Sequence, residues 1–132
     1  MPTRADTPKS SATPPIRKPG ARPAPQFKGL LEFDHVSFSY DGKHEILRDV
    51  SVRIEPGQVV AIVGPSGTGK TTIAGLIPRF YDPQSGRIKI DGTDIREFTL
   101  KSLRDQVNFV LQDTLLFRGT VWENIAYGKP DA

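Results

Sequence analysis

The stretch Gly64-Pro65-Ser66-Gly67-Thr68-Gly69-Lys70-Thr71 fits the phosphate-binding pattern G-x-x-x-x-G-K-[ST]. Before it, residues 58–63 form a short apolar, β-branched run that is typical of a buried parallel strand. After it, residues 72–77 carry apolar side chains at helical spacing. A strand, a glycine-rich loop and a helix in this order are the context in which the pattern cradles phosphates. The stretch therefore predicts that the chain binds a nucleoside triphosphate through a P-loop.

This interpretation has a physical basis in the backbone. Glycines let successive N–H groups point inward as an anion-binding nest, and the following helix adds its own unpaired N-terminal donors. Lys70 is expected to reach the β- and γ-phosphates, and the Thr71 hydroxyl is expected to ligate Mg²⁺. The alternative, a glycine-rich turn with a chance lysine, is disfavoured by the flanking strand and helix. The stretch expected to contact the nucleotide comprises Gly64, Pro65, Ser66, Gly67, Thr68, Gly69, Lys70, Thr71 and Thr72.

Length and composition narrow the class of protein. The 132 residues leave room for one domain, and 36% hydrophobic with 25% charged residues is ordinary for a globular chain. The absence of cysteine excludes a disulfide framework and a thiolate metal site. No apolar run approaches the roughly 20 residues needed to cross a bilayer, and the first 28 residues lack the apolar centre of a signal peptide. The chain is therefore expected to hold no membrane span of its own.

The basic charge is concentrated at the N-terminus. Residues 1–28 hold six basic residues and one acidic residue, a balance of +5, whereas the rest hold 12 basic and 14 acidic residues, a balance of −2. The same 28 residues carry seven of the twelve prolines. This composition predicts a disordered, proline-rich basic linker, with a domain over residues 29–132. The alternative is a basic arm for nucleic acid or acidic lipid, which the diluted charges and missing aromatics disfavour.

Short-range patterns predict the elements around the P-loop. Apolar and polar residues alternate over residues 31–38, as in a half-buried strand, and residues 46–54 supply a second strand. These two antiparallel strands lead into the parallel strand at 58–63, so the expected class is α/β. The capping-box pattern Thr120-Val121-Trp122-Glu123 predicts a helix that runs towards Gly128. Three further elements are expected: a strand over 87–90, a helix over 99–104 and a buried strand over 107–111.

Taken together, residues 29–132 resemble the nucleotide-binding domain of an ATP-binding cassette (ABC) transporter. The resemblance implies a P-loop NTPase core, of the ABC ATPase type, with an N-terminal antiparallel β subdomain. The last of its motifs is similar to the exporter branch that handles drugs, lipids and peptides. The motifs that carry it, besides the P-loop, are Phe38-Ser39-Tyr40, Arg79-Phe80-Tyr81-Asp82-Pro83, Ser85-Gly86, Ile90-Asp91-Gly92, Val110-Leu111-Gln112-Asp113 and the run from Leu116 to Ile125.

The resemblance implies roles for two residues outside the P-loop. Tyr40 matches the aromatic residue that stacks on adenine; by itself it reads as an ordinary aromatic at a strand end. Gln112 matches the Q-loop glutamine, which contacts Mg²⁺ and the attacking water; alone it reads as a residue of a solvated loop. The expected catalytic residues are therefore Lys70 and Gln112, and the expected metal ligands are Thr71 and Gln112.

The resemblance also implies the cofactors and partners. ATP and Mg²⁺ would be bound, and hydrolysis in the complete protein would power export. The expected partners are a membrane-spanning domain and a second nucleotide-binding domain, at the cytoplasmic face of the membrane, with no nucleic acid. One alternative is a non-catalytic nucleotide-binding fragment or regulatory module. Another alternative is a soluble ABC ATPase of DNA repair or translation. The exporter-like run from Leu116 to Ile125 and the negative net charge of residues 29–132 disfavour it.

The sequence departs from the family pattern after Gln112, because it ends 20 residues later. It thus stops before the signature helical segment, the second acidic strand and the switch histidine that the family places there. The 132 residues alone are therefore expected to lack hydrolytic activity, and to fold marginally because apolar strand edges stay open.

Five residues that carry none of these expected roles also have expected places. His35 and His44 are expected at the surface rather than in a metal site, and Asp91 and Asp94 in turns. Trp122 fits either the core, which is slightly favoured, or a patch that docks a membrane domain.

Overall fold

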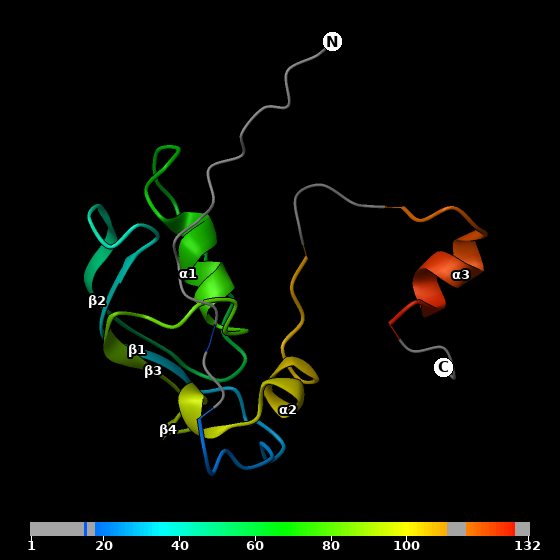
Figure 1. The fold of residues 1–132 in the computed structure, drawn as a ribbon, viewed down its shortest axis with the longest axis horizontal. Helices are drawn as coiled ribbons and strands as arrows, with labels where there is room; N and C mark the ends of the chain where they lie inside the picture. Colours follow the sequence, from blue (N-terminus) through cyan, green and yellow to red (C-terminus); the bar gives the residue numbers. More distant parts are fainter. Residues whose placement is uncertain (1–14, 16–17, 111–115, 129–132) are drawn as a thin grey trace.

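The fold is a four-stranded antiparallel sheet with two of its short helices packed against it. The computed structural model describes residue 15 and residues 18–110 and 116–128 (Figure 1). Within the sheet the strands lie in the order β2-β1-β3-β4. In chain order the elements are β1 (Leu31–Ser39), β2 (Glu45–Ile54), α1 (Lys70–Leu76), β3 (Ser85–Ile90), β4 (Thr93–Asp94), the 3₁₀ helix η1 (Ile95–Glu97), α2 (Leu100–Arg104) and α3 (Val121–Ala126).

Strand β1 is the centre of the sheet and pairs with a neighbour on each side. Phe33 lies opposite Val52 of β2 and opposite Ile88 of β3. The alternating pattern of residues 31–38 explains the pairing, because one face of such a strand packs inward and the other meets water. The antiparallel β subdomain predicted from the sequence is confirmed, as are the helices at α2 and α3, the latter with both hydrogen bonds of its capping box.

The hydrophobic core lies between the sheet and the helices α1 and α2. Strands β1, β2 and β3 supply the residues on the sheet side of the core. Leu76 of α1 and Leu103 of α2 lie on the other side, with Ile95 of η1 and Phe98, which follows η1. Because both helices are short, this packing rather than helix propensity stabilises them. The core residues are Phe33, Val36, Phe38, Leu47, Leu76, Ile88, Ile90, Ile95, Phe98 and Leu103.

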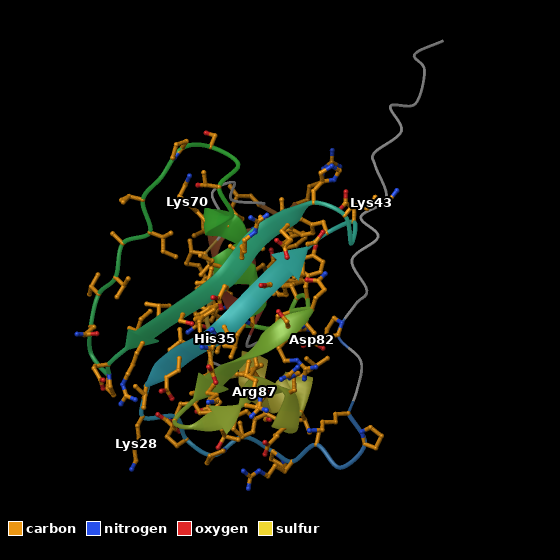
Figure 2. The ribbon with its side chains drawn as sticks, turned by 90° about the vertical axis from the view of Figure 1, so that its left-hand side faces the viewer. Lys28, His35, Lys43, Lys70, Asp82 and Arg87 are labelled. Atoms are coloured by element: carbon orange, nitrogen blue, oxygen red, sulfur yellow. The ribbon has the colours of Figure 1, made fainter. Side chains whose placement is uncertain are left out.

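Two predicted strands are absent from the structure. Residues 58–63 belong to a loop that leads away from the sheet before the chain reaches Lys70 (Figure 2). Val59 and Val63 in this loop are 100% and 87% exposed. Residues 107–110 of the strand expected over 107–111 are likewise unpaired, and residue 111 lies outside the described residues. A parallel strand needs hydrogen-bonding neighbours and helices on both faces, and no strand among the described residues lies beside either segment.

Part of the expected linker lies along the domain. Residues 18–30, which we call the strap, contact the region of η1 and α2, and Arg22 forms a parallel bridge with Phe98. The backbone N–H of Ala24 donates to Ser102 Oγ at 2.8 Å, and that of Phe27 donates to Gln106 Oε1 at 2.9 Å. The domain boundary at residue 29 stays a prediction. The hydrogen bonds of the strap use backbone N–H groups, which its non-proline residues supply.

Asp91 ties the end of the strap to the β3–β4 turn. Its carboxylate accepts backbone N–H bonds from Lys28 at 2.7 Å, Gly29 at 3.1 Å and Leu30 at 3.0 Å. Desolvation raises the pKa of Asp91, but these three donors together outweigh it and hold the pKa below its ordinary value. The Asp91 carboxylate is therefore a hydrogen-bond acceptor that works in its ionised form.

We expect Asp91→Asn to lower the free energy of unfolding at neutral pH and to have little effect in acid. Because the folded-state pKa is depressed, the stabilisation is fully present above the ordinary pKa near 3.8 and is lost as the pH falls through the folded-state value. Urea unfolding of both chains at about pH 6 and about pH 3 measures the difference. Asp105→Asn, which breaks an exposed ion pair with Lys101, is the matched control. A pH-independent difference would contradict this account.

Candidate nucleotide-binding site

A cavity of about 420 Å³ lies at the beginning of α1, where the P-loop meets the sheet. In Figure 2, Lys70 and the β1–β2 turn that carries Lys43 lie toward the same end of the sheet, and Lys28 of the strap lies at the other. Seven of the eight residues that line the cavity were predicted from the sequence. The lining is Tyr40, Ile46, Ser66, Gly67, Gly69, Lys70, Thr71 and Thr72.

Gly69 sets the junction between the P-loop and α1. It is the N-cap residue of the helix, with a φ of 85°, a left-handed conformation that glycine adopts without strain. A Cβ atom there would lie 2.7 Å from Leu47 Cδ2 and 3.2 Å from the carbonyl oxygen of Ile46. The last glycine of the motif is thus required twice, for its backbone conformation and for close packing against β2.

Lys70 closes the loop on itself. Its ammonium group donates to the carbonyl oxygen of Gly64 at 2.7 Å and to that of Pro65, and Thr68 Oγ1 donates to the same Pro65 oxygen at 2.8 Å. These hydrogen bonds hold the positive charge of Lys70 within the loop, where the bonds remain accessible to solvent. The ammonium can therefore exchange carbonyl oxygens for the more strongly interacting oxygens of a phosphate.

Tyr40 supplies the aromatic part of the cavity wall. Its hydroxyl lies 3.0 Å from Thr72 Oγ1, on the first turn of α1. The Thr72 residue is buried and Tyr40 is half-buried, so one aromatic side chain joins the end of β1 to the phosphate-binding helix. The arrangement places an aromatic ring beside the P-loop, as the family resemblance implies.

The turn after Tyr40 is held by Asp41. Its carboxylate accepts hydrogen bonds from the backbone N–H groups of His44 and Lys43, each at 2.8 Å, and from Ser39 Oγ at 3.0 Å. These donors, with the backbone N–H of His44 the strongest, lower the pKa of Asp41 far below its ordinary value. The carboxylate is thus ionised throughout the neutral range and fixes the chain that positions Tyr40.

The remaining predicted site residues lie elsewhere. Gly64, Pro65 and Thr68 belong to the loop but do not line the cavity. Gln112 and its neighbour Asp113 lie outside the described residues. Ile46, the one lining residue that was not predicted, is an apolar residue at the start of β2; nothing in its local pattern distinguishes it from a core residue.

The other singled-out residues have structural places. His35 and His44 are exposed and pair with Asp49 and Asp41, hydrogen bonds that raise the pKa of each imidazole. Among the described residues no group of three potential ligands could hold a metal ion. Asp94 caps η1 by accepting from the Arg96 backbone N–H. Trp122 is 66% exposed, so the favoured expectation of a core position is wrong for the described part of the chain.

None of the helices in the described ranges has the length and apolar character to cross a bilayer.

Comparison with known proteins shows which family the chain resembles. The family model described as "ABC transporter" matches residues 47–132. YgaD of Bacillus subtilis (strain 168), assigned as a multidrug export ATP-binding/permease protein, is 58% identical over 116 residues, which are 87% of this chain and 20% of that protein. The ATP-dependent lipid A-core flippase of Alkalilimnicola ehrlichii (strain ATCC BAA-1101 / DSM 17681 / MLHE-1) is 48% identical over 116 residues, with the same coverage.

A solved structure agrees with the fold. A bacterial Atm1-family ABC exporter with ATP bound superposes with a TM-score of 0.83 at 47% identity, covering 88% of this chain and 20% of the exporter chain. The chain thus spans one fifth of the length of these relatives. The residues matched by the family model include the P-loop and the residues of α1 that line the cavity. On this evidence the chain belongs to the ABC transporter family.

Proposed function

We propose that the chain binds MgATP in the cavity between the P-loop and Tyr40. The observation that carries the proposal is that both contribute to one cavity: its lining includes Lys70, Thr71 and Thr72 as well as Tyr40. A triphosphate fits the ammonium group and the glycine backbone of this lining, and an adenine ring fits the aromatic ring. The lining thus offers a partner for each end of the ligand.

The individual roles follow from the side chains. Lys70 would hold the β- and γ-phosphates by charge-assisted hydrogen bonds. The Thr71 hydroxyl lines the cavity and is a hard oxygen donor of the kind that Mg²⁺ prefers, so the residues present fit this ion. The ion would neutralise phosphate charge when bound. Gln112 is proposed as the second metal contact and as the residue that orients the attacking water.

The 132 residues by themselves are proposed to bind ATP without hydrolysing it. Hydrolysis requires a positioned group to orient or deprotonate the attacking water. Among the described residues that line the cavity there is no carboxylate. Lys70 and Thr71 bind and polarise, and neither can accept the proton.

In a longer protein, this part of an ATPase domain is proposed to power export. The relatives named above are a multidrug export ATP-binding/permease protein and a lipid A-core flippase, which combine nucleotide binding with membrane transport. We infer that the domain works at the cytoplasmic face of a membrane, with a membrane-spanning domain and a second nucleotide-binding domain as partners. Nucleic acid has no place in this arrangement.

Titration calorimetry of the purified chain with MgATP is the direct test. We expect one binding event per chain, displaced by inorganic triphosphate, because both ligands use the P-loop. Adenosine should bind much more weakly than either, since it offers only the aromatic contact. Binding of adenosine without binding of triphosphate would place the ligand outside the P-loop and contradict the proposal.

A further inference from the structure

The segment that follows α1, residues 78–82, is fastened at several points. The side chain of Arg79 is only 3% exposed and donates to Asp82 twice, from Nε to Oδ1 and from Nη2 to Oδ2, both at 2.7 Å. Arg104 of α2 donates to the carbonyl oxygens of Pro78 at 2.9 Å and Arg79 at 2.7 Å. The Arg79 guanidinium thus forms a bidentate ion pair within the segment, and the Arg104 guanidinium binds two of its backbone carbonyl oxygens. The proposed function assigns no role to the residues of this segment.

Tyr81 lies inside this fastened segment, between Arg79 and Asp82, and its ring contacts Tyr40 in the wall of the cavity. The ring centroids of Tyr81 and Tyr40 lie 5.3 Å apart with planes at 89°, an edge-to-face contact. Phe38, buried in the core, contacts both rings, at 4.9 Å from Tyr40 and 5.7 Å from Tyr81. The three aromatic side chains therefore contact one another pairwise.

Tyr40 is consequently held at both ends of its side chain. The hydroxyl is bound at Thr72, and the ring is held by Phe38 and Tyr81. Rotating the ring would break the hydrogen bond and two aromatic contacts, each such pair being worth about 0.5–1.5 kcal/mol. A ring that is already oriented loses less conformational freedom when a ligand stacks on it.

We propose that Tyr81, fixed by the Arg79–Asp82 ion pair, is a positioning residue for the adenine-binding face of Tyr40. This inference rests on the proposed function, because it assumes that the base lies on Tyr40. Tyr81 itself is not among the residues that line the cavity, and it acts through its ring contacts with Tyr40 and Phe38. Its effect is therefore confined to the base half of the ligand, and it sets affinity for the nucleotide without setting affinity for the phosphates.

The test compares two ligands, MgATP and magnesium triphosphate, on four forms of the full chain. In Tyr81→Leu the ring is lost, and the Kd for MgATP should rise about three- to tenfold while that for triphosphate stays within about twofold. Tyr81→Phe keeps the ring and should bind both ligands as the parent chain does. Tyr127→Leu, at an exposed tyrosine near the end of α3, is the matched control and should change neither Kd.

The ratio of the two Kd values separates positioning from a merely structural role. Loosening of the whole site would weaken both ligands equally, and an equal change in both would overturn the proposal, as would no change in either. If triphosphate fails to bind the parent chain, the P-loop proposal fails on its own. If triphosphate binds and the Tyr81 variants leave the ratio unchanged, only the present inference fails.

A measurement on the unsubstituted chain covers the case in which Tyr81→Leu does not fold. Nuclear Overhauser contacts between the Tyr40 and Tyr81 rings should be present in the free chain and should persist with MgATP bound. Their loss on binding would overturn the proposal without any variant. Asp82→Asn offers a second route, because it keeps both rings, weakens the hold on Arg79 and should raise the Kd for MgATP selectively.

Discussion

Replacing Lys70 with alanine is expected to raise the Kd for MgATP by about 100-fold. The ammonium group is the one cation among the described residues that line the cavity, and it already donates to two carbonyl oxygens of the loop. Phosphate oxygens carry more charge than carbonyl oxygens, so the exchange favours the nucleotide. Without the ammonium, the loop retains its backbone donors and the aromatic wall. Titration calorimetry of both chains measures the change.

Lys101→Ala is the matched control for this prediction. Lys101 lies on α2, pairs with Asp105 and is exposed, so its removal changes the net charge by the same amount away from the cavity. Its Kd for MgATP should stay within about twofold of the parent value. Equal losses in the two variants would mean that long-range charge, not a local contact, holds the nucleotide.

Replacing Gly86 with alanine is expected to destabilise the fold by about 3 kcal/mol or more. Gly86 lies in β3 with a φ of 79°, opposite the irregular stretch of β1. A Cβ atom there would meet the carbonyl oxygen of His35 and lie 2.5 Å from that of Asp34. Both obstacles are backbone, so they cannot move aside as a flexible side chain would. The central β1–β3 pairing has to open.

Gly92→Ala separates the clash from the backbone conformation. Gly92, in the β3–β4 turn, has the same φ of 79°, but no atom lies within 4 Å of a Cβ placed there. Alanine should cost about 1 kcal/mol at Gly92, from the left-handed conformation alone. The difference between the two variants, measured by urea unfolding, is the cost of the clash. Similar losses in both would show that strand packing at Gly86 is adaptable.

The sequence predicted the elements whose signals are local. The capping box at Thr120 and Glu123 involves residues three positions apart, and both of its hydrogen bonds are present. The signals for the strand at residues 31–38 and for the Asp91-Gly92 turn are similarly short-range, and the structure contains both, with an irregular register in β1 between Phe33 and Val36. Within the candidate site the P-loop motif is likewise a run of consecutive residues, and several of them line the cavity. Its role in nucleotide binding stays a prediction.

Features that depend on distant partners could not be predicted. The β-branched run at residues 58–63 reads as a strand in isolation, but a strand is defined by its neighbours, and the described residues supply none. Ile46 lines the cavity only because β2 packs against Gly69. The strap escaped prediction for the same reason, since its partners lie far along the chain.

The docking of the strap has a consequence for the order of events during synthesis. Ala24 and Phe27 bind side chains that follow them by 78 and 79 residues, at Ser102 and Gln106. Contacts of such sequence separation close a long loop and carry its entropy cost. At a synthesis rate of about 5–20 residues per second, several seconds pass between the synthesis of the strap and that of its partners in and after α2. The strap cannot form these hydrogen bonds earlier. The strap is thus translated early but forms its contacts late, after the strands of the sheet have been synthesised.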